Sequence, residues 1–108
     1  MAKKKLPLIV KKNINEYIAA LKKDRLPIER VILFGSYAKG KQRRWSDIDL
    51  CIVSSKFKDA WRALQYLWSK RIYDSGITIE PVGFSKRDFK YPSSLIAEIK
   101  RTGIDIPV

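Results

Sequence analysis

The chain has 108 residues, 45% of them hydrophobic and 11% aromatic, which suits one packed domain and excludes a disordered segment. It has no histidine and one cysteine, Cys51, which excludes histidine chemistry and a disulfide framework and favours the cytoplasm. The net charge of +12 indicates an anionic partner, such as nucleic acid, a nucleotide or an acidic protein, or else a lysine-rich solvated surface. No apolar run reaches the roughly 18 residues that a membrane span needs, so no membrane partner is expected.

The spacing of apolar residues predicts a helix near the start of the chain. After a basic tail over residues 1–5, the helix begins near Pro7, which suits a first helical turn, and ends near Asp24. Its apolar residues recur with helical spacing and are Val10, Ile14, Tyr17, Ile18 and Leu21. The apolar run over residues 28–34 then predicts a short buried strand.

Two short motifs follow this strand. Gly35-Ser36 breaks it where a glycine lets the backbone turn sharply, and free amides after such a turn can cradle a phosphate. Asp47 and Asp49 stand two apart at the mouth of a second strand, residues 48–53, so both lie on one of its faces. Adjacent carboxylates repel unless a cation lies between them, and Mg²⁺ takes such oxygen ligands beside substrate phosphates. The two motifs together predict nucleotide chemistry.

The loop between the motifs, residues 39–45, is basic. We interpret its lysines and arginines either as a clamp over nucleotide phosphates or as an ordinary solvated loop. Trp45 either stacks on a base or, as we favour, covers the edge of the core. Gly35 and Gly40-Lys41 also match most of a P-loop, but Gln42 stands where that motif needs Ser or Thr to hold Mg²⁺. We therefore reject a P-loop.

The second half of the chain predicts a helix, a strand and a last helix. The first of these helices would be capped by Ser54 or Ser55 and would pack through a stripe comprising Phe57, Ala60, Trp61, Leu64, Leu67 and Trp68. The last would begin at Ser93 or Ser94 and end at Gly103, with a short strand over residues 104–106.

The third strand, residues 77–82, contains a carboxylate among apolar residues. An isolated buried carboxylate is strongly disfavoured, so Glu80 needs a partner. We favour the metal site of Asp47 and Asp49 over the alternative, a Lys or Arg. Pro81 lacks an N–H donor and suggests either an edge strand or the end of regular strand pairing.

These elements predict an α/β fold. A strand–helix–strand unit should have parallel strands with a right-handed crossover. We expect a small mixed β-sheet of mostly three strands, with the carboxylates on one exposed face and the helices packed mainly on the other.

Over the segments Gly35-Ser36-Tyr37-Ala38-Lys39-Gly40 and Ser46-Asp47-Ile48-Asp49-Leu50 the sequence resembles the minimal nucleotidyltransferases of the DNA polymerase β-like superfamily. The resemblance covers most of the chain and implies one minimal nucleotidyltransferase domain over residues 1–108. It implies transfer of a nucleoside monophosphate, AMP from ATP, to an acceptor hydroxyl, while pyrophosphate leaves.

The resemblance also implies roles for six residues, which are Gly35, Ser36, Lys39, Asp47, Asp49 and Glu80. The three carboxylates would be catalytic and would hold two Mg²⁺ ions, and Glu80 could accept the proton. The Gly35 amides and the Ser36 hydroxyl would hold the phosphates, and Lys39 would neutralise the leaving pyrophosphate. Two positions depart from the family pattern: Lys39 stands where Arg is common, and Glu80 where many members have Asp.

The resemblance suggests a protein partner too. Minimal nucleotidyltransferases are often paired with a helical HEPN protein, a ribonuclease toxin, which they neutralise as antitoxins by binding it or by transferring AMP to a tyrosine. Residues 39–44 and 86–91 are candidates for the partner-facing rim, or ordinary solvated loops. The alternative function is a noncatalytic basic module that binds nucleic acid through phosphates, with affinity that falls steeply with salt and does not depend on the aspartates.

Overall fold

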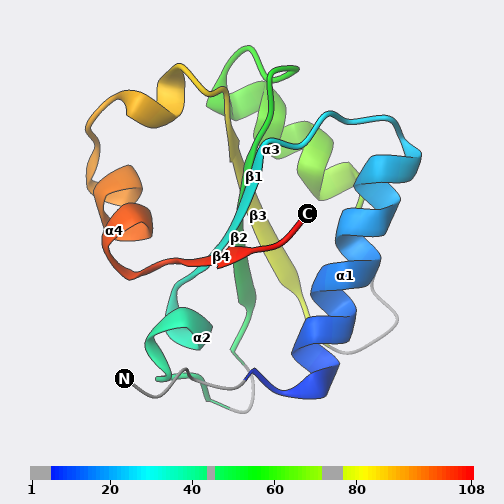
Figure 1. The fold of residues 1–108 in the computed structure, drawn as a ribbon, viewed down its shortest axis with the longest axis vertical. Helices are drawn as coiled ribbons and strands as arrows, with labels where there is room; N and C mark the ends of the chain where they lie inside the picture. Colours follow the sequence, from blue (N-terminus) through cyan, green and yellow to red (C-terminus); the bar gives the residue numbers. More distant parts are fainter. Residues whose placement is uncertain (1–5, 44–45, 72–76) are drawn as a thin grey trace.

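The computed structural model describes residues 6–43, 46–71 and 77–108. Arg44, Trp45 and the basic tail lie outside the described residues, and what we expect of them stays a prediction. Figure 1 shows a central sheet, seen nearly edge-on, with helices on both sides.

One mixed sheet forms the centre of the molecule, with the strand order β3-β2-β1-β4. The strands are β1 (Arg30–Phe34), β2 (Ile48–Val53), β3 (Ile79–Phe84) and β4 (Ile104–Ile106). β1 is antiparallel to β2 and β4, whereas β2 and β3 are parallel. The α/β fold with a mixed sheet is thus confirmed, as is the parallel pair, and β4 adds a fourth strand to the three we chiefly expected.

The helices lie on both faces of this sheet. They are α1 (Leu8–Lys23), α2 (Ser36–Lys39), α3 (Ala60–Ser69), the 3₁₀ turn η1 (Asp88–Lys90) and α4 (Ser94–Thr102). The longer helices α1 and α3 cover one face, and α4 and η1 cover part of the face that we expected to be exposed (Figure 1). Within the described residues no helix has the length and apolar character to cross a bilayer.

Alternating side chains along β2 supply two separate cores. Ile48, Leu50 and Ile52 face α1 and α3, whereas Cys51 and Val53 face α4. All five are at most 2% exposed, and burial of each aliphatic side chain stabilises the fold by about 1.5–3 kcal/mol. Burial also raises the pKa of the free Cys51 thiol to about 12, as fits a small buried hydrophobe.

The side of α3 that packs against the core differs from the side predicted by the apolar stripe. Ala63 and Leu67 are buried, but Trp61 is 66% exposed and Trp68 43% exposed, so the prediction is wrong for both tryptophans. The reason is the close approach of β3: a Cβ on Gly83 would lie 2.8 Å from Leu67 and 2.9 Å from Ala63. A tryptophan does not fit between a helix and a strand that are so close.

The helix caps agree only in part with the sequence. The cap of α3 is Asp59, whose carboxylate accepts a hydrogen bond of 2.7 Å from the backbone N–H three residues further on. Ser54 and Ser55, which we expected in this role, precede a loop instead, because the helix begins later than its apolar stripe. For α4 the prediction is confirmed, with Ser93 as N-cap and Gly103 as C-cap.

α1 ends in a left-handed turn at Arg25, whose φ is +62°. The N–H of Arg25 donates to the Lys22 carbonyl at 2.9 Å. The N–H of Leu26 donates to the Leu21 carbonyl at 3.1 Å. This pair of bonds is a Schellman motif, in which the left-handed position is usually glycine.

β3 forms one edge of the sheet, as Pro81 predicted. It begins at Ile79, two residues later than expected from the apolar run. The Pro81 carbonyl accepts a hydrogen bond of 3.2 Å from the indole N–H of Trp68 on α3. The half-exposed Trp68 is therefore bonded to the edge strand rather than packed in the core.

Candidate active site

The two motifs meet at one end of the sheet. β1 ends where β2 and β3 begin, because β1 is antiparallel to β2 and β2 is parallel to β3 (Figure 1). In the strand register Phe34 lies opposite Asp49, and Asp49 lies opposite Glu80. Adjacent strands are about 4.8 Å apart, so both motifs and the third carboxylate lie close together.

Gly35 has a conformation and a contact that only glycine allows. Its φ is +76°, in the range that other residues rarely adopt. A Cβ at this position would lie 2.1 Å from Oδ2 of Asp49. The backbone of the turn therefore packs directly against the carboxylate, which joins the first motif to the second.

α2 holds the turn in place. Tyr37 and Ala38 are buried and anchor this short helix on the core, while Ser36 beside them stays partly accessible. Gly40, with a φ of +70°, ends the helix in the left-handed region. The backbone that follows Gly35 is thus fixed at the mouth of the site.

The carboxylates repel one another. Burial raises the pKa of Asp49, and the charge of Asp47 raises it further. The pKa of Glu80 is raised by burial, by the hydrogen bond between the Glu80 and Asp47 carboxyls and by repulsion from both aspartates. Asp49 and Glu80 also lie on the face of the sheet that α4 covers only in part. A cation bound among these groups would relieve the repulsion.

Among the residues that the structure describes, no three acidic, thiol or imidazole side chains are already gathered into a metal site. The chemistry of the donors nevertheless fits a hard divalent cation, since three carboxylates from neighbouring backbone positions supply oxygen ligands only. Binding such a cation would require these side chains to turn toward one another.

The sequence did not single out Arg71, which follows α3. Its positive charge lowers the pKa of Glu80, and its guanidinium lies 4.0 Å from the Trp68 ring centroid. Glu80 therefore interacts with the aspartates and with an arginine, and the metal site that we favoured as its partner stays a prediction. No spacing pattern marks Arg71; only the need of Glu80 for a countercharge could have suggested it.

Lys39, at the end of α2, is held by α4. Its ammonium lies 2.5 Å from Oε1 of Glu98, which also pairs with Arg101. Hydrogen bonds from Lys39 and Arg101 lower the pKa of Glu98. Lys39, which we expected to contact phosphate, is thus held by α4, a helix that the sequence did not connect with the site. In the loop that follows, Lys41 and Arg43 are exposed.

A family model described as "Nucleotidyltransferase domain" matches residues 12–104. The chain belongs to this family. The expected resemblance to nucleotidyltransferases is thereby confirmed, whereas the single domain over residues 1–108 stays a prediction. The turn at Gly35 and the three carboxylates lie within the matched range.

Curated proteins of Methanocaldococcus jannaschii that share the name "Putative protein adenylyltransferase" are similar to this nucleotidyltransferase domain. MJ0141 is 30% identical over 98 residues, which cover 88% of this chain and 93% of MJ0141. MJ1305 is 34% identical over 67 residues, 58% of this chain and 46% of MJ1305. The matches thus span less than half the length of MJ1305 and of a third relative, MJ0604.

Solved structures support the nucleotidyltransferase fold. A crystal structure described as a toxin–antitoxin with AMP-PNP has a TM-score of 0.57 and 25% identity, covering 86% of this chain and 71% of the other. A "putative nucleotidyltransferase" from Sulfolobus solfataricus has a TM-score of 0.61 and covers 96% of this chain and 90% of the other. Its identity of 16% shows the likeness of fold alone.

Proposed function

We propose that the protein is an Mg²⁺-dependent nucleotidyltransferase that moves AMP from ATP to an acceptor hydroxyl. One observation carries the proposal: the Gly35 turn lies directly against Asp49, which pairs in register with Glu80. Membership of the family, the names of the curated relatives and the AMP-PNP complex of a structural neighbour support it.

In this proposal the residues of the two motifs have different roles. The backbone amides after Gly35 and the Ser36 hydroxyl hold the triphosphate. The acceptor oxygen forms a bond to the α-phosphorus as the bond to the β-phosphate oxygen breaks, and the pyrophosphate leaves. Glu80 accepts the hydroxyl proton, as a carboxylate beside the attacking oxygen can. Lys39 neutralises the pyrophosphate once its ammonium exchanges Glu98 for phosphate.

Asp47, Asp49 and Glu80 are the residues that would hold Mg²⁺, as two ions. When bound, the metal would stabilise charge on the phosphates and acidify the attacking hydroxyl. We place the protein in the cytoplasm, where ATP and Mg²⁺ are available and the free Cys51 thiol stays reduced.

Calorimetry with ATP tests the site. We expect Mg²⁺-dependent binding by the wild type and its loss in the Asp47→Asn/Asp49→Asn variant. A Glu16→Gln/Asp105→Asn variant removes the same two negative charges at exposed positions and should bind like the wild type. Equal binding by the wild type and the aspartate variant in Mg²⁺ would contradict the proposed site.

We further propose that the acceptor is a tyrosine of a HEPN-type helical protein, so that this protein acts as an antitoxin. The similarity to a toxin–antitoxin structure supports a protein partner. Incubation with such a partner, ATP and Mg²⁺ should raise the partner's mass in steps of one AMP. Efficient labelling of RNA ends by the isolated protein, without transfer to the partner, would contradict this acceptor.

A further inference from the structure

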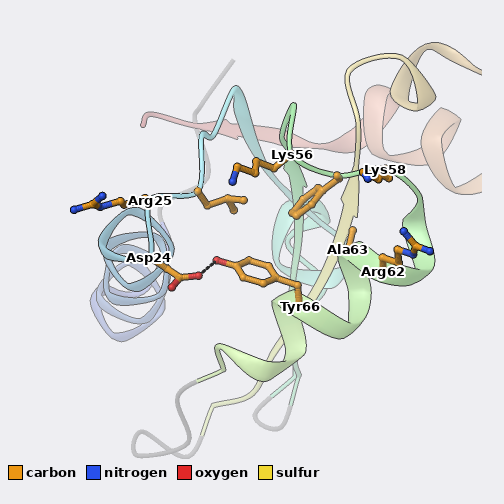
Figure 2. A pocket seen from close by; sticks show the side chains of 9 residues that line it. Asp24, Arg25, Lys56, Lys58, Arg62, Ala63 and Tyr66 are labelled. Carbon is orange, nitrogen blue, oxygen red and sulfur yellow. Dashed lines mark hydrogen bonds between the residues drawn. The ribbon is translucent and has the colours of Figure 1, made fainter.

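The end of the sheet opposite the carboxylates is strongly basic. β2 ends and β1 begins there, and a cavity opens on each face of the sheet. The first, of about 290 Å³, lies between the end of α1 and the start of α3 (Figure 2) and is lined by Arg25, Lys56, Lys58 and Arg62. The second, of about 580 Å³, lies beside η1 and is lined by Arg30, Lys86 and Lys90.

These seven cations face only two acids among the residues that line the cavities, Asp24 and Glu29. Asp24 is already compensated, because it accepts the Tyr66 hydroxyl hydrogen bond and lies 3.4 Å from the Lys70 ammonium. The lining of both cavities is therefore a concentrated positive region. The negative charge of the proposed active site lies at the other end of the sheet.

Most of these cations are available to a ligand. Arg62 pairs with Asp59, and Arg30 pairs with Asp105. Within residues 6–43, 46–71 and 77–108 the remaining five form no ion pair, and all five are exposed; they are Arg25, Lys56, Lys58, Lys86 and Lys90. A bound phosphate would thus not have to break existing pairs.

Aromatic side chains lie beneath both cavities. Phe57 and Tyr66 line the first, with ring centroids 6.3 Å apart, and Tyr66 is the partly accessible one, because Phe57 is only 7% exposed. Phe89 lines the second but is 5% exposed and lies beneath the Arg30 guanidinium at 5.5 Å and the Lys100 ammonium at 4.9 Å, so its ring is closed to a base. Cationic grooves with aromatic side chains are how proteins bind single-stranded nucleic acid, with phosphates on the cations and bases on the rings.

The arrangement of the cations suits an extended ligand. In Figure 2, Lys56 and Tyr66 face the first cavity from opposite sides, while Arg25 and Arg62 point away at its two ends. The charges therefore form a row and do not converge on one compact phosphate. Arg25 keeps its place in this row in a strained left-handed conformation, where glycine would be relaxed.

We propose that single-stranded nucleic acid binds across this basic end, with its phosphates along the row of cations and a base against the partly accessible Tyr66 ring. This site goes beyond the proposed transfer reaction and does not depend on it. An acidic protein is the other occupant that the charge allows, and the experiment distinguishes the two.

Fluorescence anisotropy with fluorescein-labelled 12-nucleotide oligo(rU) and oligo(dT) at 50 mM KCl tests the site. We expect Lys56→Gln/Lys58→Gln to weaken binding about tenfold. The association constant should also fall less steeply with salt, so that the slope of its logarithm against the logarithm of the salt concentration becomes less negative by about 1.4, the value for two lost phosphate contacts. The matched control, Lys11→Gln/Lys12→Gln, removes the same charge from exposed positions near the other end of α1 and should leave affinity within about twofold.

Three outcomes would overturn the proposal. The first is that the wild type binds neither oligonucleotide, which would leave only an acidic protein as occupant. The second is an equal loss in both lysine variants, which would mean unspecific attraction by the net charge. The third is loss of oligonucleotide binding in Asp47→Asn/Asp49→Asn, which would mean that the oligonucleotide binds in the active site. Retained oligonucleotide binding with lost ATP binding in that variant supports the basic site and separates it from the proposed transferase.

Discussion

Asp49 lies where its negative charge is unfavourable, half-buried beside Asp47 and Glu80, and its pKa is raised. Between the usual aspartate pKa of 3.8 and the raised value, the folded protein therefore binds more protons than the unfolded chain. Under this condition the free energy of unfolding falls as the pH rises. The charge that the proposed reaction needs thus destabilises the metal-free fold at neutral pH.

Asp49→Asn should therefore raise the melting temperature of the metal-free protein by a few degrees at pH 7, while it abolishes transfer. The gain should shrink as the pH is lowered toward 3.8, where the wild-type carboxyl is protonated too. Circular dichroism melts with a chelator over a pH series measure this. Glu29→Gln, at an exposed site without a side-chain ion pair among the described residues, is the control. Equal melting temperatures for Asp49→Asn and wild type at neutral pH would contradict the argument.

Gly35→Ala should destabilise the protein by about 1–3 kcal/mol, because the new Cβ meets Asp49 and the backbone conformation is strained. It should also abolish ATP binding, since relief of the contact displaces the turn or the carboxylate. Gly40→Ala imposes similar strain, at a φ of +70°, six residues after the end of β1. That variant should lose stability but keep ATP binding, and loss of ATP binding in both variants would refute a specific role for the Gly35 contact.

At the scale of single elements, the end of α1 combines strain with charge. Arg25→Gly should stabilise the protein by about 1 kcal/mol, because glycine adopts the left-handed conformation without strain. For a domain of this size that raises the melting temperature by about 4–8 °C. The same change removes a cation from the proposed nucleic-acid site and should weaken oligonucleotide binding severalfold.

Arg25→Ala is the matched variant, because it removes the same cation but keeps the strained backbone. It should weaken oligonucleotide binding as much as Arg25→Gly does, without the gain in melting temperature. If the alanine and glycine variants were equally stable, the left-handed turn would not be the source of the strain.

The ion pair between Lys39 on α2 and Glu98 on α4 should affect nucleotide affinity. Glu98 competes with phosphate for the Lys39 ammonium, so Glu98→Gln should tighten ATP binding by about threefold. Calorimetry on Glu98→Gln, Lys39→Ala and the double variant measures the effect. In the Lys39→Ala background the Glu98 substitution should change nothing, and an undiminished gain there would show that Glu98 acts on another group.

Local features of the fold and of the site could be predicted from the sequence, whereas contacts between distant elements could not. The motifs are local, so Gly35, the paired aspartates and their strands could be predicted from spacing. The need of Glu80 for a partner predicted its pairing beside Asp49, which the register confirms. Periodicity could not identify the buried side of α3, because the approach of Gly83 decides it and that contact is distant in sequence. The approach of Arg71 to Glu80 and the ion pair between Lys39 and Glu98 depend on tertiary packing in the same way.

At the scale of the whole molecule, the net charge of +12 acts across a body of 34 × 31 × 21 Å. The Debye length is about 30 Å at 0.01 M salt and about 10 Å at 0.1 M. In dilute buffer the excess positive charges therefore repel one another across the whole molecule, whereas at 0.1 M only neighbouring charges do so.

Raising KCl from about 10 mM to about 100 mM should accordingly raise the melting temperature by a few degrees. Thermal melts in the two buffers, without divalent ions, provide the measurement. Replacing KCl with the same concentration of NaCl should give the same shift, because screening does not depend on which monovalent cation is present. A fall in melting temperature would mean that favourable ion pairs outweigh the excess of positive charge.

The hydrogen bond from Trp68 to Pro81 has a consequence for assembly between molecules. An open strand edge can template the next chain and start fibril growth. Here the Pro81 carbonyl is occupied by the indole, and the proline nitrogen has no hydrogen to offer. The opposite edge, β4, is only three residues long. Both features disfavour extension of the sheet from one molecule to the next.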